Sequence, residues 1–238
     1  MKIALIGYGK MGRTIHDILV ERGHKVSTIV DKDNLEDIHE INKENTDVSI
    51  EFTNPRSALG NISLCLKNKV PVITGTTGWY QELPAVQAIV NKTGGCFFHS
   101  SNFSLGVNIF FKLNRFLARI MDAYQEYSPT IHEAHHTEKI DAPSGTAITL
   151  ANDLIEELSL PDQWINEKSN DKTKIGITSA RSPNVAGTHI VSYHSTIDTL
   201  EIKHKANTRE GFATGAVLVA EWIPNRTGML TMDDFIKI

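Results

Sequence analysis

The strongest constraint on the fold is a glycine-rich turn close to the amino terminus. Gly7, Gly9 and Gly12 form the pattern G-x-G-x-x-G, after an apolar run at residues 3–6 and before apolar residues at helical spacing. This context predicts a strand, a tight turn and a helix whose free N–H groups could bind a pyrophosphate. A plain turn between strand and helix is the simpler alternative. We expect dinucleotide contacts from the whole loop: Gly7, Tyr8, Gly9, Lys10, Met11 and Gly12.

An acidic residue follows the second predicted strand, at residues 25–30. Asp31 lies 19 positions after Gly12, close to the offset of about 20 for an acid that binds ribose hydroxyls. Its carboxylate would favour NADH, because it repels the 2′-phosphate of NADPH, whereas Lys32 could offset that repulsion. Lys32 could equally be a solvated surface lysine. We expect both cofactors to be used, with NADH at least competitive.

The order of predicted elements indicates an α/β protein with two domains. Strands alternating with helices predict a Rossmann-like parallel sheet, covered on both faces, in the first hundred residues. A long helix then precedes three strands without helices between them, which favours an α+β domain with an antiparallel or mixed sheet. The last helix, after residue 210, is expected to return to the first domain. We expect a dinucleotide-binding domain at 1–103 and 212–238 and a second domain at 104–211. The expected strands lie at 3–6, 25–30, 48–52, 70–73, 96–98, 175–181, 188–196 and 199–206; the expected helices include 105–124 and 147–158, and 159–174 is expected to be a polar loop.

The composition narrows the classes of partner. The chain has 238 residues, 40% hydrophobic and 22% charged, with a net charge of −4. These values are typical of a globular protein and argue against nucleic acid or an anionic membrane as partner. The apolar runs fall short of the roughly 18–20 residues of a membrane span. We therefore expect a cytoplasmic protein.

Two further strand ends carry small polar residues. Thr-Gly-Thr-Thr-Gly at 74–78 and Ser-Ser-Asn-Phe at 100–103 each follow a predicted parallel strand. Open α/β sheets bind ligands at this edge, although by pattern alone each segment is as readily a turn. The cofactor contacts expected here are Gly75, Thr76, Thr77, Ser100, Ser101, Asn102 and Phe103.

Residues 132–147 carry the densest set of reactive side chains, and two interpretations compete there. Residues 132–136 spell H-E-x-x-H, the pattern of zinc proteases, whose chemistry needs a helix that places both histidines on one face. Pro129 and Pro143 flank the segment and argue against such a helix. We therefore expect no metal site.

The second interpretation is a site for reducing a small anion. His135, His136 and Lys139 supply positive or proton-donating groups. Gly145 and Thr146 open the next predicted helix, so their N–H groups could bind a carboxylate. A histidine with a pKa near neutrality could supply the proton that accompanies hydride transfer. A polar loop with a well-capped helix is the plainer alternative.

These motifs together resemble the dihydrodipicolinate reductase family. The resemblance rests on G-x-G-x-x-G, on Glu51-Phe52-Thr53, on T-G-T-T-G and on S-N-F-S-L-G-V-N from residue 101. Above all, E-A-H-H-T-E-K-I-D-A-P-S-G-T-A at 133–147 looks like the family's signature segment. Gly187-Thr188-His189, residues 204–215 and the ending G-M-L-T-M-D-D-F extend the match along almost the whole chain.

The resemblance implies a function. It implies NADH- or NADPH-dependent reduction of 4-hydroxy-tetrahydrodipicolinate to tetrahydrodipicolinate, with loss of water, on the route to diaminopimelate and lysine. It implies that residues 104–211 form a substrate-binding and oligomerisation domain, whose sheet builds a homotetramer. His135 resembles the proton donor and Lys139 its catalytic partner, while His136, Gly145 and Thr146 resemble contacts to a dicarboxylate substrate.

Other functions remain open on the residues alone. Another two-domain nicotinamide enzyme, such as an amino-acid or semialdehyde dehydrogenase, would share the first half and lack the His-His-x-x-Lys segment. A non-enzymatic sensor would bind dinucleotide without oxidising it. A metal analysis would identify a zinc hydrolase.

Overall fold

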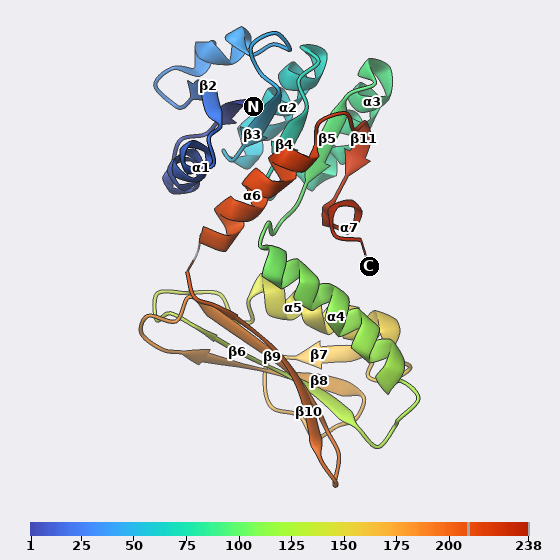
Figure 1. Cartoon of the computed structure of the whole chain (residues 1–238). Coiled ribbons are helices and arrows are strands. Elements are labelled where there is room, and N and C mark those ends of the chain that lie inside the picture. Colours follow the sequence, from blue (N-terminus) through green and yellow to red (C-terminus); the bar gives the residue numbers. More distant parts are fainter. Residues whose placement is uncertain (209, 238) are drawn as a thin grey trace. The chain divides into compact units, whose positions relative to one another are not determined.

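The chain is organised as two units, drawn in Figure 1. The computed structural model describes residues 1–208 and 210–237. Unit 1 comprises Met1–Leu105 with Glu210–Ile238, and unit 2 comprises Gly106–Arg209. The domain limits expected from the sequence differ from these by two residues. Arg209 and Ile238, which fall within the two expected domains, lie outside the described residues.

Unit 1 contains a six-stranded sheet in the order β11-β5-β4-β3-β1-β2, with every neighbouring pair parallel. The Rossmann-like parallel sheet expected from the sequence is confirmed. Because β2 and β3 lie on opposite sides of β1, the strand order reverses there, and ligands bind at the carboxyl ends of strands at such a point. The strands are β1 (Lys2–Ile6), β2 (Lys25–Val30), β3 (Val48–Glu51), β4 (Val72–Thr74), β5 (Cys96–His99) and β11 (Gly228–Leu230).

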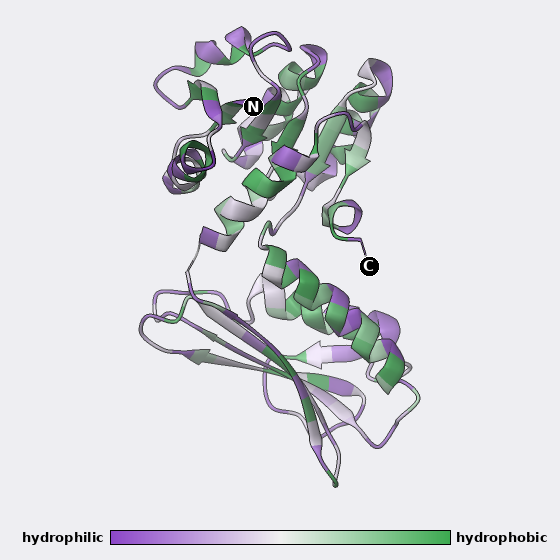
Figure 2. Cartoon of the chain, in the orientation of Figure 1, coloured by the Kyte–Doolittle hydropathy of each residue, from purple (hydrophilic) through white to green (hydrophobic). Residues whose placement is uncertain are grey.

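Helices cover both faces of this sheet, which explains why its strands are apolar on both sides. Along β1, Ile3 and Leu5 pack with α1 and α6, whereas Ala4 and Ile6 pack with α2 and α3. Figure 2 shows these strands as largely hydrophobic. Glu221 on α6 binds Arg22 and His24, which follow α1, so the expected return of the last helix is confirmed. The helices are α1 (Lys10–Glu21), α2 (Pro55–Lys67), α3 (Leu83–Thr93), α6 (Glu210–Trp222) and α7 (Met232–Phe235), with 3-10 turns η1 (Leu35–Glu40) and η2 (Tyr80–Glu82).

Unit 2 contains a five-stranded mixed sheet in the order β10-β9-β6-β8-β7, as expected. β6 and β7 run parallel to β8, whereas β9 runs antiparallel to β6 and β10. Helices α4 and α5 pack on one face of this sheet (Figure 1). On the other face, called the open face below, the segment at residues 167–169 lies over Gly176 of β8. The elements are α4 (Leu105–Met121), β6 (Ser128–His135), α5 (Gly145–Glu157), β7 (Gln163–Ile165), β8 (Lys174–Arg181), β9 (Gly187–His194) and β10 (Thr199–Ala206).

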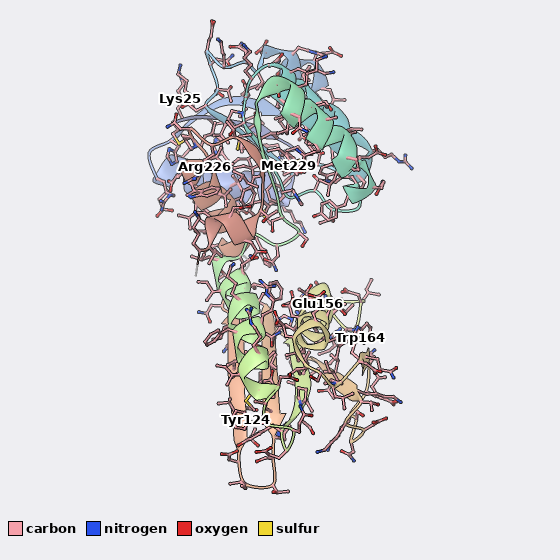
Figure 3. All side chains as sticks on the ribbon, turned by 90° about the vertical axis from the view of Figure 1, so that its right-hand side faces the viewer. Lys25, Tyr124, Glu156, Trp164, Arg226 and Met229 are labelled. Atoms are coloured by element: carbon pink, nitrogen blue, oxygen red, sulfur yellow. The ribbon has the colours of Figure 1, made fainter. Side chains whose placement is uncertain are left out.

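The prediction of a loop over residues 159–174 is wrong at its centre, because β7 lies within it. Strand β7 contacts α5, on which Figure 3 labels Glu156, and the Trp164 ring of β7 packs against the core of the unit. A three-residue strand is too short to produce a periodic pattern, so the sequence carries no signal for it. Among the described residues, no helix is long and apolar enough to cross a membrane.

Candidate active site

The glycine loop of unit 1 has the geometry that its spacing predicts. Gly7 has φ +96°, and a Cβ there would lie 2.1 Å from the carbonyl oxygen of Phe52. A Cβ on Gly12 would lie 2.1 Å from the carbonyl oxygen of Gly7, so only glycine lets the helix start so close to the turn. Both positions therefore exclude side chains for steric reasons.

The start of α1 is open to an anion. Gly9 precedes the helix and provides no side-chain acceptor for its first N–H groups, and a Cβ added there would meet nothing within 4 Å. Free N–H groups and open space in front of a helix are what a pyrophosphate requires. Lys10 is exposed, Met11 is half-buried, and the Tyr8 ring lies 5.0 Å from the Arg13 guanidinium. The residues present therefore fit a dinucleotide phosphate.

The turn after β2 presents the predicted acid. The Asp31 backbone N–H donates to Asn34 Oδ1 at 2.7 Å, and the Asn34 amide donates to Ile29 O at 2.8 Å. These bonds hold the turn from within, so the Asp31 carboxylate is left half-exposed beside the exposed Lys32. The pair is accessible to a ribose or to a 2′-phosphate.

The carboxyl ends of β3 and β4 form a pocket beside the glycine loop. A cavity of about 310 Å³ is lined by Met11, Phe52, Thr53, Pro55, Gly75, Thr76 and Thr77. A Cβ on Gly75 would lie 2.1 Å from the Phe52 ring, so glycine lets this ring line the pocket. The structure thus brings Met11 together with the Gly75–Thr77 segment. Phe52 also lines the pocket and is not among the site residues predicted from the sequence.

The buried carboxylate of Glu51 forms hydrogen bonds with residues at this pocket. Glu51 is fully buried and accepts hydrogen bonds from the hydroxyl groups of Thr53 and Thr74. Thr76 Oγ1 in turn accepts from the Thr53 N–H at 2.8 Å. Glu51 is not among the site residues predicted from the sequence. A glutamate at the end of an apolar strand is the signal that could have identified it. Burying a carboxylate costs free energy unless it is hydrogen-bonded or paired, and such groups are frequent at functional sites.

The segment after β5 forms a self-contained turn. Ser100 Oγ donates to Asn102 O at 2.7 Å and accepts from the Asn102 N–H at 3.1 Å. Ser101 is exposed, but the Phe103 side chain is buried against the rings of Phe52 and Phe98. Phe103 could therefore contact a cofactor only through its backbone.

In unit 2, β6 extends through the segment that spells H-E-x-x-H. Strand alternation places Glu133 and His135 on the side that faces the helices, and both are buried. His132 points to the open face, where its Nδ1 lies 2.9 Å from Thr178 Oγ1. Because the zinc-protease pattern needs a helix, it does not form here.

Glu133 lies at the centre of a buried polar cluster. Its two carboxylate oxygens accept the Ser144 N–H, each at 3.1 Å, and Oε1 accepts the Ser179 hydroxyl at 2.8 Å. Oε2 lies 3.6 Å from His189 Nε2. Burial raises the pKa of Glu133, but the nearby His189 ring and the hydrogen bonds from Ser144 and Ser179 outweigh it and lower the pKa to about 2. The carboxylate is therefore ionised at neutral pH.

His135 adjoins this carboxylate. Its Nδ1 lies 3.7 Å from Glu133 Oε2 and has no hydrogen-bond partner among the described residues. The rings of His135 and His189 meet edge to face with centroids 5.1 Å apart. Burial lowers the pKa of His135 to about 4, against the opposing attraction of Glu133. The ring is therefore neutral at pH 7 in the ligand-free chain.

Lys139 lies in the loop between β6 and α5. Its Nζ donates to both carboxylate oxygens of Asp141, at 2.8 and 2.7 Å, which lowers the pKa of Asp141. Arg181 fixes the same loop, because its guanidinium donates to the carbonyl oxygens of Lys139 at 3.2 Å and Asp141 at 2.6 Å. His136 is half-buried in this loop.

The start of α5 carries the second predicted anion pocket. Ser144 precedes the helix, and its side chain accepts the Ala147 N–H at 3.2 Å. Gly145 is exposed with open space at its Cβ position, and Thr146 is half-buried. Their N–H groups therefore lie at the accessible start of the helix. The Glu133 carboxylate accepts the Ser144 N–H at the start of this helix and also lies beside the His135 ring, so it contacts both the predicted anion pocket and His135.

Glu133, His135 and His189 have ligand atoms within 4.8 Å of one another, an arrangement that could hold a metal ion. The guanidinium of Arg181 lies 3.7 Å from Glu133 Oε1 and opposes a further positive charge. The buried Nδ1 of His189 has no acceptor among the described residues, whereas metal-bound histidines usually donate from their other nitrogen. The expected absence of a metal stays a prediction. His189 and Arg181 were not selected from the sequence.

Comparisons with known proteins cover the whole chain. Residues 1–103 match the family model described as dihydrodipicolinate reductase, N-terminus, and residues 106–236 match that described as dihydrodipicolinate reductase, C-terminus. A 4-hydroxy-tetrahydrodipicolinate reductase of Christiangramia forsetii is 45% identical over 237 residues, covering 100% of this chain and 98% of the relative.

Solved structures share the fold. A dipicolinate-bound dihydrodipicolinate reductase from Paenisporosarcina sp. TG-14 has a TM-score of 0.78 at 22% identity, with complete coverage of both chains. A diaminopimelate dehydrogenase of C. glutamicum, in complex with diaminopimelate, has a TM-score of 0.54 at 12% identity, covering 97% of this chain and 92% of that one. The second likeness shows a shared fold alone.

Proposed function

The chain belongs to the dihydrodipicolinate reductase family, and on that basis we propose that it reduces 4-hydroxy-tetrahydrodipicolinate to tetrahydrodipicolinate, with loss of water. The observation that carries the proposal is the match of both family models, which together span nearly the full length. The protein is then an oxidoreductase of the diaminopimelate and lysine route. An amino-acid dehydrogenase or a dinucleotide sensor is the competing function.

Unit 1 is proposed to bind the nicotinamide cofactor, which when bound supplies the hydride. The first N–H groups of α1 would hold the pyrophosphate, since Gly9 leaves them open. The pocket at Gly75, Thr76 and Thr77 offers backbone and hydroxyl groups to a flat ring. Ser100, Ser101 and Asn102 extend the same carboxyl edge.

Unit 2 is proposed to bind the dicarboxylate substrate. The N–H groups of Gly145 and Thr146 would hold one substrate carboxylate. Lys139 would release Asp141 and bind the second substrate carboxylate. His136 is proposed as a further substrate contact. His135 would donate the proton that completes the reduction, with Glu133 as the negative charge beside its Nδ1. The substrate's own charge would help to protonate the ring, because an opposite charge raises a histidine pKa.

The cofactor preference rests on Asp31 and Lys32. The half-exposed carboxylate of Asp31 favours ribose hydroxyls, and the adjacent ammonium tolerates a phosphate. We propose that both NADH and NADPH are used, with NADH at least competitive. Asp31→Asn should raise kcat/KM for NADPH relative to NADH, because the variant removes the repulsion. An unchanged ratio would exclude Asp31 from this role.

We propose that the protein forms a homotetramer in the cytoplasm. The open face of the unit 2 sheet, which includes Thr130, His132, Thr178 and His194, is the surface assigned to this assembly, because α4 and α5 cover the other face. Light scattering should give four times the chain mass of 26.4 kDa. A monomer mass would refute the tetramer without touching the proposed activity.

The direct test is a coupled assay. The purified protein is mixed with aspartate semialdehyde, pyruvate and the synthase that condenses them, and the absorbance of NADH or NADPH is followed. Oxidation that requires all three upstream components supports the reductase and gives the cofactor preference in the same run. Cofactor binding without oxidation would favour a sensor, and reduction of NAD⁺ or NADP⁺ by an amino acid alone would favour an amino-acid dehydrogenase.

A further inference from the structure

The Glu133 carboxylate contacts two parts of the proposed site that come from different elements. Through the Ser144 N–H it holds the residue at which α5 begins, next to Gly145 and Thr146. Through Oε2 it faces the Nδ1 of His135 at 3.7 Å. One buried side chain therefore sets the distance between the proposed proton donor and the proposed carboxylate pocket.

The environment of Glu133 is divided between its two oxygens. Oε1 accepts the Ser179 hydroxyl at 2.8 Å and lies 3.7 Å from Arg181 Nη1, both on β8. Oε2 lies between the rings of His135 and His189. The β8 contacts anchor the carboxylate, so its second oxygen faces the histidines in a fixed position. Lys139 on the following loop is the remaining charged group that influences His135.

We infer that Glu133 is a positioning residue of the reductase, whose negative charge holds the protonated ring of His135 and whose oxygens fix the start of α5. The inference rests on the proposed function and adds to it a residue that acts through others. A glutamine at this position would have the same shape and could still accept the Ser144 N–H, but it would lack the charge. A charge requirement therefore separates this role from simple packing.

The test compares Glu133→Gln with Glu133→Asp in the full-length protein. In Glu133→Gln, kcat should fall roughly 10²-fold, as for loss of general-acid catalysis. The basic limb of the kcat–pH profile should move to lower pH by about 1–3 units, since an opposite charge at this distance is worth that much. Glu133→Asp keeps the charge and should leave the basic limb near its original pH.

Asp153→Asn is the matched control. Asp153 is also a buried carboxylate of unit 2, near the end of α5, where it pairs with Arg115 at 3.2 Å. Burial raises the pKa of Asp153 to about 6. Above that pH its loss removes one buried negative charge without touching Glu133, so the basic limb should not move. A shift of equal size in Asp153→Asn, or no shift in Glu133→Gln, would overturn the inference.

A measurement without turnover separates this inference from the proposed function. Histidine-labelled protein is titrated by NMR, and the His135 ring is followed in wild type and Glu133→Gln. The wild-type ring should begin to protonate as the pH approaches 4, and the variant ring should stay neutral at the same pH. Identical curves would refute the role of Glu133 even in an active enzyme. An inactive wild type with different curves would refute the proposed reductase and retain the Glu133–His135 coupling.

Discussion

Binding of a dicarboxylate should drive a proton onto His135, and the size of this effect follows from its environment. In the ligand-free chain burial lowers the His135 pKa to about 4, so at pH 7 the charged form costs about 4 kcal/mol. A carboxylate about 4 Å from the ring, at an effective dielectric constant of about 20, would return about 4 kcal/mol. One bound carboxylate therefore balances the cost of burial, and a second makes protonation favourable.

The assay is calorimetric titration with pyridine-2,6-dicarboxylate at pH 7, in buffers of different ionisation enthalpy. The slope of the observed heat against the buffer enthalpy counts the protons taken up. We expect between about half a proton and one proton per chain, from the balance above. His135→Gln should abolish the uptake. His132→Gln changes a histidine on the opposite side of the same strand and should preserve it. Binding without proton uptake in the wild type would refute the reasoning.

Three further predictions concern kinetics, acid stability and cofactor binding. His135→Ala should retain cofactor binding and lose about 10²–10⁴-fold in turnover. Lys139→Ala should also lower kcat. A raised KM with an unchanged kcat would limit Lys139 to ground-state binding of the substrate. Because burial depresses the folded-state pKa of His135 from 6.5 to about 4, the unfolded chain binds more protons between these values, so stability is lost as pH falls through this window. Glu133 adds a further loss below about pH 4.5, since its pKa is lowered to about 2. Burial raises the pKa of Asp153 to about 6, which contributes in the opposite direction over the same window, so the His135 effect is measured as a difference between variants. In urea unfolding, the change in stability from pH 7 to 4 should be less destabilising by about 3 kcal/mol in His135→Gln than in the wild type, and equal changes in the two proteins would contradict it. Glu51→Gln should disturb the hydrogen bonds that hold Thr53 and Thr74, and NADH binding, followed by fluorescence titration, should weaken about tenfold, which corresponds to about 1.4 kcal/mol of binding free energy. Ser49→Ala is a buried change on the same strand and should leave the NADH affinity unchanged.

The first half of the protein could be predicted from its sequence because its signals are local. The glycine spacing, the preceding strand and the following helix all lie within residues 2–21, and steric limits at Gly7 and Gly12 need only their near neighbours. The parallel sheet followed from the alternation of strands and helices. The family resemblance likewise rests on contiguous motifs, and both family models match.

The cluster around Glu133 could not be predicted, because strand pairing creates it. Register places Ser179 of β8 and His189 of β9 directly opposite Glu133 on its two sides, although both lie more than 40 residues away in the chain. A one-residue slip of either strand would turn these side chains to the open face. No local pattern encodes that register, and a buried carboxylate has no propensity signal. The sequence by itself determined the chemical groups and the fold class, whereas tertiary structure decided which of these groups lie around the Glu133 carboxylate.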